Sequence, residues 1–228
     1  EADDDSPYFL EVAEGGGEIT RFSRENFVKK ELNNGKESIG DWLSSDFNLE
    51  NAAAASAFTS LQGISWSVIK QALTSFKGVP GRMEIIQENP FKVVIDYAHT
   101  PDSLLKIYET FGKAKLVCVL GAAGGGRDKW KRPEMGRIAS EHCREIILTN
   151  EDPFDESPLE IISQIKSGIS NPRILEANVR EVLDRKEAIK MAIGLAKKND
   201  VVIITGKGSE AWLRIEKGKK IPWNEREI

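Results

Sequence analysis

The segment that most constrains the fold is residues 91–129, which combines two apolar runs, a helical pattern and a glycine-rich loop. The β-branched run at 93–95 stops at Asp96, and apolar residues then recur at helical spacing until a second run at 116–120. Two buried strands joined by one helix form a βαβ unit, and open parallel sheets bind ligands just past their strand ends. The candidate site residues by position are therefore Asp96, His99, Arg127 and Asp128.

The rest of the chain continues this alternation. Strand patterns lie at about 83–87, 91–96, 115–120, 144–149, 200–205 and, weakly, 219–222, and helix patterns lie at about 101–112, 133–142, 158–168 and 184–198. Alternation of this kind predicts a doubly wound, Rossmann-like α/β sheet. The two cysteines, Cys118 and Cys143, lack the spacing of a metal or redox motif, so we expect both to be reduced core residues.

A separate domain is expected before this sheet. The segment 77–81, KGVPG, contains two glycines and a proline, which end the preceding helix and favour a junction between domains. We therefore predict domains at 1–79 and 80–228. The first contains two short strand patterns, at 8–12 and 18–22, and two helix patterns, at 48–62 and 65–77, joined by Gly63.

Charge and hydropathy exclude several classes of partner. The net charge is −4 with both signs mixed along the chain, which predicts no surface for nucleic acid or for an anionic membrane. No apolar run approaches the ~20 residues that span a bilayer, and the first residues lack the features of a signal peptide. We therefore expect a cytoplasmic protein. Because the sequence does not start with Met, we also expect it to begin inside a larger protein.

Four motifs follow strands, and each has a structural alternative. The glycine-rich loop at 121–129 matches neither a Rossmann fingerprint nor a GxxxxGK[ST] loop, and it could be a plain surface loop. In DYAHTP, Asp96 suits ribose hydroxyls, whereas Thr100 before a proline suits a helix N-cap. In GKGSE, Glu210 is favoured by the helix dipole with or without a ligand. The carboxylates of TNEDPFDESP suit either a cationic substrate or solvent.

Together these motifs resemble the Mur ligases, the ATP-dependent amino-acid ligases of peptidoglycan precursor synthesis, and most closely the tripeptide synthetases among them. The resemblance is carried in order by FNLEN, GVPGRME, DYAHTPDSL, GAAGGGRDKWKRPEMGRIA, TNEDP and GKGSE. It implies that residues 1–79 are the later part of a central α/β ATPase domain and that 80–228 form the C-terminal Rossmann-like domain. The family's phosphate loop would lie upstream, so the resemblance implies that the isolated chain is inactive.

The resemblance also implies an activity and its residues. The enzyme would use ATP and Mg²⁺ to activate the carboxylate of UDP-N-acetylmuramoyl-L-alanyl-D-glutamate as an acyl phosphate, and a diamino acid would then attack it to form an amide. The residues implied to bind nucleotide are Asn51, Arg82, Asp96 and His99. Those implied to bind the amino acid are Arg127, Glu151, Asp152, Gly206 and Glu210. No residue is assigned to proton transfer or to metal binding.

Two departures from the family pattern bear on the amino acid. Ser209 replaces a frequent His, and Phe154 replaces the Arg with which members that add diaminopimelate bind its distal carboxylate. Because Glu151 and Asp152 add negative charge beside it, we expect lysine or ornithine in preference to meso-diaminopimelate. The alternatives are a related folylpolyglutamate or cyanophycin synthetase, which DYAHTP and GRDK disfavour, and a non-catalytic amino-acid-binding module.

Overall fold

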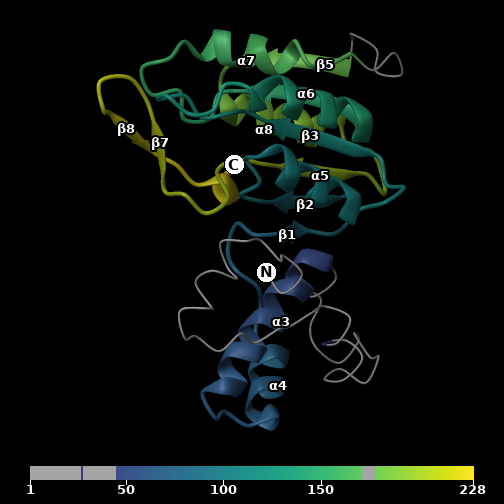
Figure 1. Cartoon of the computed structure of the whole chain (residues 1–228). Coiled ribbons are helices and arrows are strands. Elements are labelled where there is room, and N and C mark those ends of the chain that lie inside the picture. The colour runs from purple at the N-terminus through teal and green to yellow at the C-terminus, as the bar shows by residue number, and fades with distance from the viewer. Residues whose placement is uncertain (1–26, 28–44, 171–177) are drawn as a thin grey trace. The chain divides into compact units, whose positions relative to one another are not determined.

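The computed structural model describes residues 27, 45–170 and 178–228 (Figure 1). The chain divides into two compact units, Glu1–Lys77 and Gly78–Ile228. This division falls within the glycine and proline segment that predicted a domain junction. The strand patterns at 8–12 and 18–22 lie outside the described residues.

The first unit contains the predicted helical hairpin. Helices α3 (Asp46–Leu61) and α4 (Trp66–Ser75) are joined by a turn in which Gly63 has a φ of 80°. This left-handed conformation favours glycine, which explains the residue at the turn. Buried side chains of α3 pack against α4, namely Leu49, Ala52 and Ala53 on the first helix and Trp66 and Leu73 on the second.

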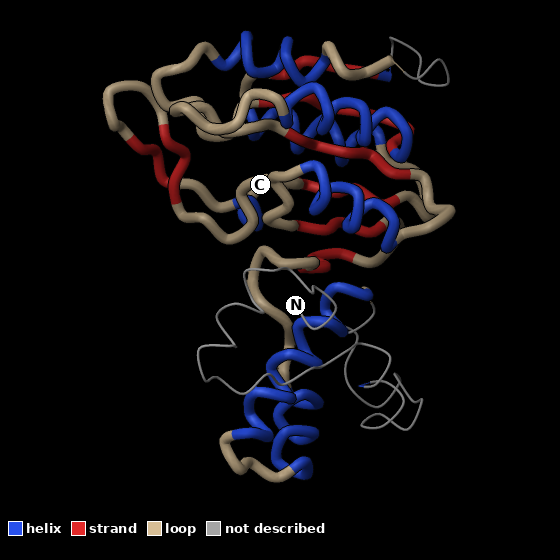
Figure 2. Tube along the Cα trace, in the orientation of Figure 1, coloured by secondary structure: helices blue, strands red, loops and turns tan. Residues whose placement is uncertain are grey.

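The second unit is built on a six-stranded sheet with the order β1-β2-β6-β3-β4-β5 (Figure 2). The strands are β1 (Glu84–Gln87), β2 (Lys92–Ile95), β3 (Leu116–Leu120), β4 (Cys143–Thr149), β5 (Val179–Val182) and β6 (Val201–Ile204). Strand β1 pairs antiparallel with β2, and the other neighbours are all parallel. The central strands β3 and β6 are buried along their whole length, as expected for a sheet covered on both faces.

Helices cover both faces of this sheet, which confirms the predicted doubly wound architecture. In Figures 1 and 2, α5 (Pro101–Thr110), α6 (Lys131–His142) and α7 (Pro158–Lys166) lie on one face and α8 (Arg185–Leu195) on the other. Thr100 caps α5 through a capping box with Ser103, as its position before Pro101 predicted. The core under α8 joins Ala188, Ile189 and Ala192 to the inward residues of the strands.

Two features of the second unit were not predicted. They are strand β5 at the sheet edge and strand β7 (Trp212–Arg214), which pairs in a hairpin with β8 (Lys220–Pro222) before the short helix η5 (Glu225–Glu227). The weak strand pattern at 219–222 did predict β8. The amide of Phe154 donates to the carbonyl of Arg214 at 3.4 Å, so the hairpin lies beside the segment that follows β4.

The expectation of two reduced cysteines is wrong for this structure. Cys118 and Cys143 form a disulfide, with their Cα atoms 6.1 Å apart. The two residues lie on the neighbouring parallel strands β3 and β4, and this proximity depends on strand pairing that Cys spacing does not reveal. No helix within the described residues is long and apolar enough to cross a membrane.

Candidate functional site

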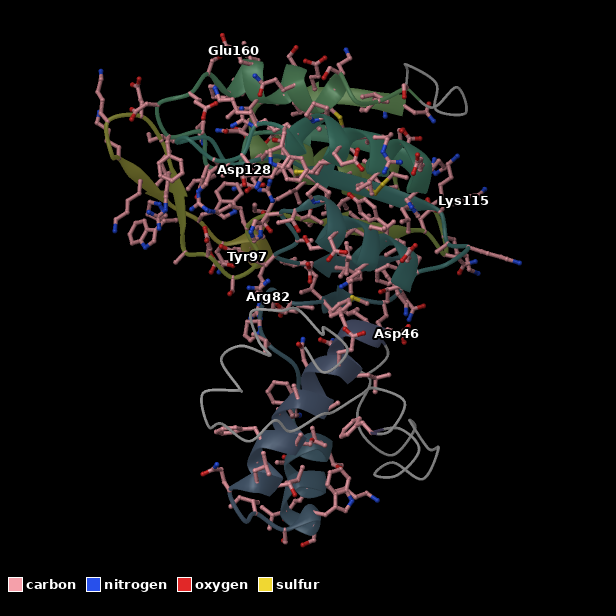
Figure 3. The ribbon with its side chains drawn as sticks, viewed as in Figure 1. Asp46, Arg82, Tyr97, Lys115, Asp128 and Glu160 are labelled. Atoms are coloured by element: carbon pink, nitrogen blue, oxygen red, sulfur yellow. A yellow bond between two sulfur atoms is a disulfide. The ribbon has the colours of Figure 1, made fainter. Side chains whose placement is uncertain are left out.

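The candidate site lies at the carboxyl edge of the sheet, where four parallel strands end. The segments that begin there follow β2 at Asp96, β3 at Gly121, β4 at Asn150 and β6 at Thr205. Figure 3 places Tyr97 and Asp128 at this end of the strands and Lys115 at the opposite end. Because the strands are parallel, segments distant in sequence meet at one edge, which is where the sequence motifs predicted a ligand site.

Lys207 connects two of these segments through a buried ionic contact. Its side chain is only 1% exposed, and its Nζ donates to Oδ1 of Asp152 at 2.9 Å and also to Oε2 of Glu210. Strand β3 lies between β6 and β4, and Lys207 and Asp152 lie in the segments that follow those two strands, so the ion pair spans the end of β3. A buried ammonium needs such partners because its desolvation is costly.

Tyr97 extends this network to the end of β2. Its phenol donates a 2.6 Å hydrogen bond to Oε1 of Glu210, and this bond raises the pKa of Tyr97. The guanidinium of Arg82 lies 4.2 Å from the centre of the Tyr97 ring, a cation–π contact. Arg82 is exposed, so its guanidinium, packed on the Tyr97 ring, leaves a positive charge accessible to solvent at this edge.

Asp96 is buried, and backbone groups occupy both of its oxygens. Oδ2 accepts from the Met83 amide at 2.6 Å and Oδ1 from the Ala98 amide at 2.7 Å. Burial raises the pKa of Asp96, while these two backbone donors and the charge of Arg82 oppose the shift. Met83 has a φ of 49°, an uncommon conformation that the bond to Asp96 stabilises. Asp96 therefore has a structural role in addition to the nucleotide contact that the resemblance implied.

His99 lies beside Tyr97 at the start of the α5 segment. Its Nδ1 is 2.8 Å from the carbonyl oxygen of Tyr97, and the two rings pack edge to face with centroids 4.8 Å apart. The carbonyl of His99 accepts from Nζ of Lys131 at 3.0 Å. Lys131 is buried, which lowers the pKa of its ammonium. The remaining predicted nucleotide residue, Asn51, is exposed on α3 in the first unit.

Glu151 and Gly206 form a close buried pair beneath the edge. Glu151 is 4% exposed, and burial raises the pKa of its carboxyl to about 7, although Arg185 and Lys207 oppose the shift. Gly206 has a φ of 104°, and a Cβ there would lie 2.1 Å from Oε2 of Glu151. The site therefore requires glycine at 206 for both space and conformation. Glu151 lies under the amino-acid site that we predicted and is covered by protein.

The acidic segment after β4 is not a free acidic patch, because its other three carboxylates have protein partners. Asp152 contacts Lys207, and Asp155 accepts from the Lys217 amide at 2.8 Å. Glu156 accepts from Nη1 of Arg132 at 2.9 Å, and this bond lowers the pKa of Glu156 to about 2. Asp152 and Glu156 are each paired with a cation, so much of the expected negative charge at this edge is cancelled.

Phe154 packs between the glycine-rich loop and the hairpin. A Cβ on Gly125 would lie 2.9 Å from the Phe154 ring, and one on Gly124 would lie 2.2 Å from the carbonyl oxygen of Pro153. The guanidinium of Arg214 lies 5.8 Å from the centre of the Phe154 ring, and its Nε is 3.8 Å from Oδ2 of Asp152. The glycines of the loop thus allow close packing against the segment after β4.

Two exposed guanidinium groups remain beside this segment. The side chain of Arg127, on the glycine-rich loop, makes no hydrogen bond or ion pair among the residues that the structure describes. Arg214 is 59% exposed and only loosely paired with Asp152. Lys131 and Arg132 are buried and bonded to protein groups, so they are not free to bind a ligand. Each of these guanidinium groups can donate two parallel hydrogen bonds to a carboxylate.

The sequence interpretation missed several residues that build this edge. Lys207 and Tyr97 were inside quoted motifs but received no role, although a lone lysine between two glycines after a buried strand is a usable signal. Arg185 was also missed; its guanidinium donates to the carbonyls of Thr205 at 2.6 Å and Asn150 at 3.3 Å. Arg214 gave no signal, because its approach depends on the fold of the hairpin.

Known proteins share much of this sequence. Relatives named UDP-N-acetylmuramoyl-L-alanyl-D-glutamate--2,6-diaminopimelate ligase include one from Clostridium tetani, 41% identical over 199 residues, and one from Aquifex aeolicus, 43% identical over 191 residues. The alignments cover 85% and 82% of this chain but only 40% and 38% of the relatives. The chain thus spans well under half the length of the curated relatives it matches.

A solved structure and a family model give the same result. A structure with that same ligase name superposes with a TM-score of 0.59 at 33% identity, covering 79% of this chain and 37% of the other. Residues 81–208 match the family described as "Mur ligase, glutamate ligase domain". That match covers more than half of the chain and includes the ends of all four strands at the site. The chain therefore belongs to the Mur ligase family.

Proposed function

We propose that this chain is the amino-acid-binding part of an ATP-dependent ligase that joins 2,6-diaminopimelate to UDP-N-acetylmuramoyl-L-alanyl-D-glutamate. Family membership and the names of the relatives support the reaction. The observation that carries the choice of amino acid is the position of Arg214, an exposed guanidinium beside the Phe154 ring.

The expectation of lysine or ornithine depended on charge that the fold largely cancels. Asp152 is paired with Lys207, and Glu151 is buried with a carboxyl pKa raised to about 7. Phe154 cannot bind a carboxylate, but Arg214 reaches the same place from β7. Diaminopimelate carries two carboxylates, whereas lysine carries one. Two exposed guanidinium groups, Arg127 and Arg214, therefore match diaminopimelate better than lysine.

In this proposal the chain's own residues bind and orient. Arg127 would bind the carboxylate next to the reacting amino group, and Arg214 the distal carboxylate. Glu210 already accepts from Tyr97 and Lys207, but it is partly exposed, and its remaining lone pairs would accept from an ammonium of the substrate. Holding the amine in one orientation lowers the entropic cost of the bimolecular step, which is the main catalytic contribution that such a site can make.

For the nucleotide, Arg82 is a better candidate contact than Asp96. Arg82 presents an exposed guanidinium that would bind an anionic phosphate, whereas the oxygens of Asp96 already accept two backbone amides. ATP supplies the activation of the substrate carboxylate. Among the described residues, no three His, Cys, Asp or Glu side chains gather so as to hold a metal ion, and we assign no magnesium ligand. The cytoplasmic location stays a prediction.

A competition assay tests the proposal. The full-length enzyme would receive ATP, the UDP-sugar dipeptide and equal concentrations of diaminopimelate, lysine and ornithine, and the products would be separated by mass. We expect the diaminopimelate product to dominate. A dominant lysine or ornithine product would reject the role of Arg214, and an absence of any product would favour the non-catalytic module. Product formed only with a folate or a cyanophycin primer would favour the related synthetases.

A further inference from the structure

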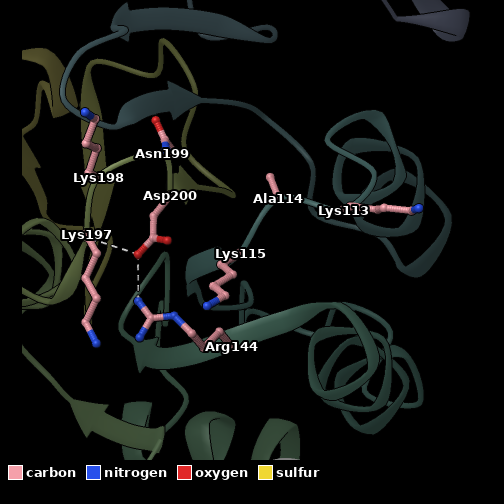
Figure 4. Close-up of a pocket in the computed structure, with 8 residues that line it drawn as sticks. All are labelled: Lys113, Ala114, Lys115, Arg144, Lys197, Lys198, Asn199 and Asp200. Atoms are coloured by element: carbon pink, nitrogen blue, oxygen red, sulfur yellow. Dashed lines mark hydrogen bonds and ion pairs between the residues drawn. The ribbon is translucent and has the colours of Figure 1, made fainter.

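A basic pocket lies at the edge of the sheet opposite the candidate site. It has a volume of about 510 Å³ and lies where β3 and β6 begin, because Lys115 directly precedes β3 and Asp200 directly precedes β6 (Figure 4). Arg144, the second residue of β4, lines the same pocket. The pocket is therefore separated from the site residues by the length of the parallel strands.

The lining is strongly cationic although the chain as a whole is anionic. Five lining side chains are cationic and one is a carboxylate, whereas the net charge of the chain is −4. The charged lining residues are Lys113, Lys115, Arg144, Lys197, Lys198 and Asp200. Several cations around one hollow attract anions to it.

The one carboxylate of the pocket is already occupied by protein donors. Oδ2 of Asp200 accepts from Nη2 of Arg144 at 2.8 Å and from the backbone amide of Lys197 at 2.8 Å. Among the described residues, the ammonium groups of the four lining lysines make no hydrogen bond or ion pair. Asp200 therefore leaves the lysine charges uncompensated.

Arg144 adds a buried donor that lacks an acceptor. Its Nη1 donates to Glu145 at 3.0 Å and its Nη2 to the Leu195 carbonyl at 3.2 Å, but its buried Nε has no hydrogen-bond partner among the described residues. In Figure 4 the ammonium of Lys115 points toward this guanidinium. A guanidinium beside an ammonium is a common arrangement for binding phosphate.

Helix dipoles explain only part of this cluster. Helices α5 and α8 end near the pocket, and a cation at a helix C-terminus is favourable. Arg144 already supplies that contact at the last residue of α8 through the Leu195 carbonyl. The dipole accounts for one cation at each helix end and leaves the others without a role.

We propose that this pocket binds a small polyvalent phosphate anion, at a site distinct from the amino-acid and nucleotide site. The volume suits a compact ligand, Lys115 and Arg144 supply adjacent donors, and the other lining lysines add positive charge to the surrounding surface. This proposal does not depend on the proposed ligase reaction, because none of its residues belongs to the other edge.

The test is a titration of the 228-residue chain with inorganic pyrophosphate at low ionic strength, followed by calorimetry and by amide chemical shifts. We expect saturable binding with one equivalent and shifts at residues 113–115 and 197–200. Lys115→Glu and Lys197→Glu should each weaken the association constant about tenfold, because each reverses one charge in the cluster. The matched control is Lys219→Glu, an exposed lysine on the β7–β8 hairpin, which should leave the constant unchanged.

Three results would overturn the proposal: binding that does not saturate, an equal loss in the Lys219→Glu control, or shifts confined to residues 82, 97 and 121–127 at the other edge. Repeating the titration with ADP distinguishes the source of the phosphate. Shifts at 113–115 and 197–200 with ADP would support a nucleoside diphosphate as the ligand, and shifts there with pyrophosphate alone would support an inorganic polyphosphate.

Discussion

The phenol of Tyr97 donates a 2.6 Å hydrogen bond to the carboxylate of Glu210, which lies 113 positions further along the chain. Strands β2 and β6 are neighbours in the sheet, so the segments that follow them meet at this bond. Through Glu210, Tyr97 is also connected to Lys207 and Asp152. One chain of side chains therefore joins the segments that follow three strands of the sheet.

Tyr97→Phe removes this hydrogen bond and keeps the ring against Arg82. We expect the free energy of unfolding to fall by about 1 kcal/mol, because the bond is partly exposed to water. Urea denaturation of the chain measures the change. Tyr97→Leu also removes the cation–π contact and should cost more than Tyr97→Phe, so equal losses in the two variants would show that the cation–π contact contributes nothing.

Lys207→Met should have a larger effect than Tyr97→Phe. The variant keeps the length of the side chain but leaves Asp152 and Glu210 without their buried cation, which should cost about 3–5 kcal/mol. The same denaturation experiment measures the loss. Adding Asp152→Asn to Lys207→Met should recover part of it, because the unpaired charge is then absent. Additive losses in the double variant would argue against a direct ionic contact.

Glu151 gives a prediction about pH. Its pKa is raised from 4.5 in the unfolded chain to about 7 in the fold, so the folded state holds this proton more tightly. The resulting stability is fully present below pH 4.5 and is lost as the pH rises to 7, by about 3 kcal/mol in total. Denaturation at pH 5 and pH 8 should show this loss in the natural chain. Glu151→Gln should lack this part of the pH dependence, and an identical pH profile in the variant would contradict the raised pKa.

Gly206→Ala tests the contact above Glu151. The added methyl would collide with the Glu151 carboxylate, and alanine disfavours a φ of 104°, so we expect a loss of about 3 kcal/mol. Gly194→Ala is the matched control, because its Cβ would meet no atom within 4 Å. That control lies in α8 and should gain about 0.5 kcal/mol from helix propensity. Similar effects at both positions would mean that the Glu151 contact is unimportant.

Arg214→Met tests the proposed specificity in the full-length enzyme. Losing a charge-assisted hydrogen bond costs about 1.5–3 kcal/mol, which corresponds to an increase of about tenfold or more in KM for diaminopimelate. KM for lysine, which lacks the distal carboxylate, should stay the same. Lys219→Met removes another exposed cation from the same hairpin and should change neither value. A parallel rise in both KM values would assign Arg214 a structural role.

The sheet could be predicted because its central strands carry strong patterns. The runs at 116–120 and 201–204 are wholly apolar and bounded by polar residues, which is typical of buried parallel strands. Strand β5 was missed because it lies at the sheet edge and contains Arg180 and Glu181, so its hydrophobic pattern is weak. Strand β7 was missed for a similar reason, with only Leu213 buried.

The position of the candidate site at the strand ends could be predicted, but which of its side chains form ion pairs could not. Motif positions placed Asp152, Gly206 and Glu210 at one edge, since parallel strands end together. The pairing of Asp152 with Lys207 depends on distances across β3 that the sequence does not contain. The same is true of Glu151, whose buried Oε2 has no hydrogen-bond partner within the described part of the chain. The cancellation of the acidic segment could therefore be recognised only in three dimensions.

The packing of Gly125 against the Phe154 ring has a consequence for how this family can diversify. A larger residue at 125 would need a smaller or differently directed residue at 154, and a long side chain at 154 would need room that the loop must provide. The two positions should therefore change together among relatives, as a co-varying pair. A single exchange of Phe154 for arginine in this chain should then fit poorly, because the loop opposite packs against a ring.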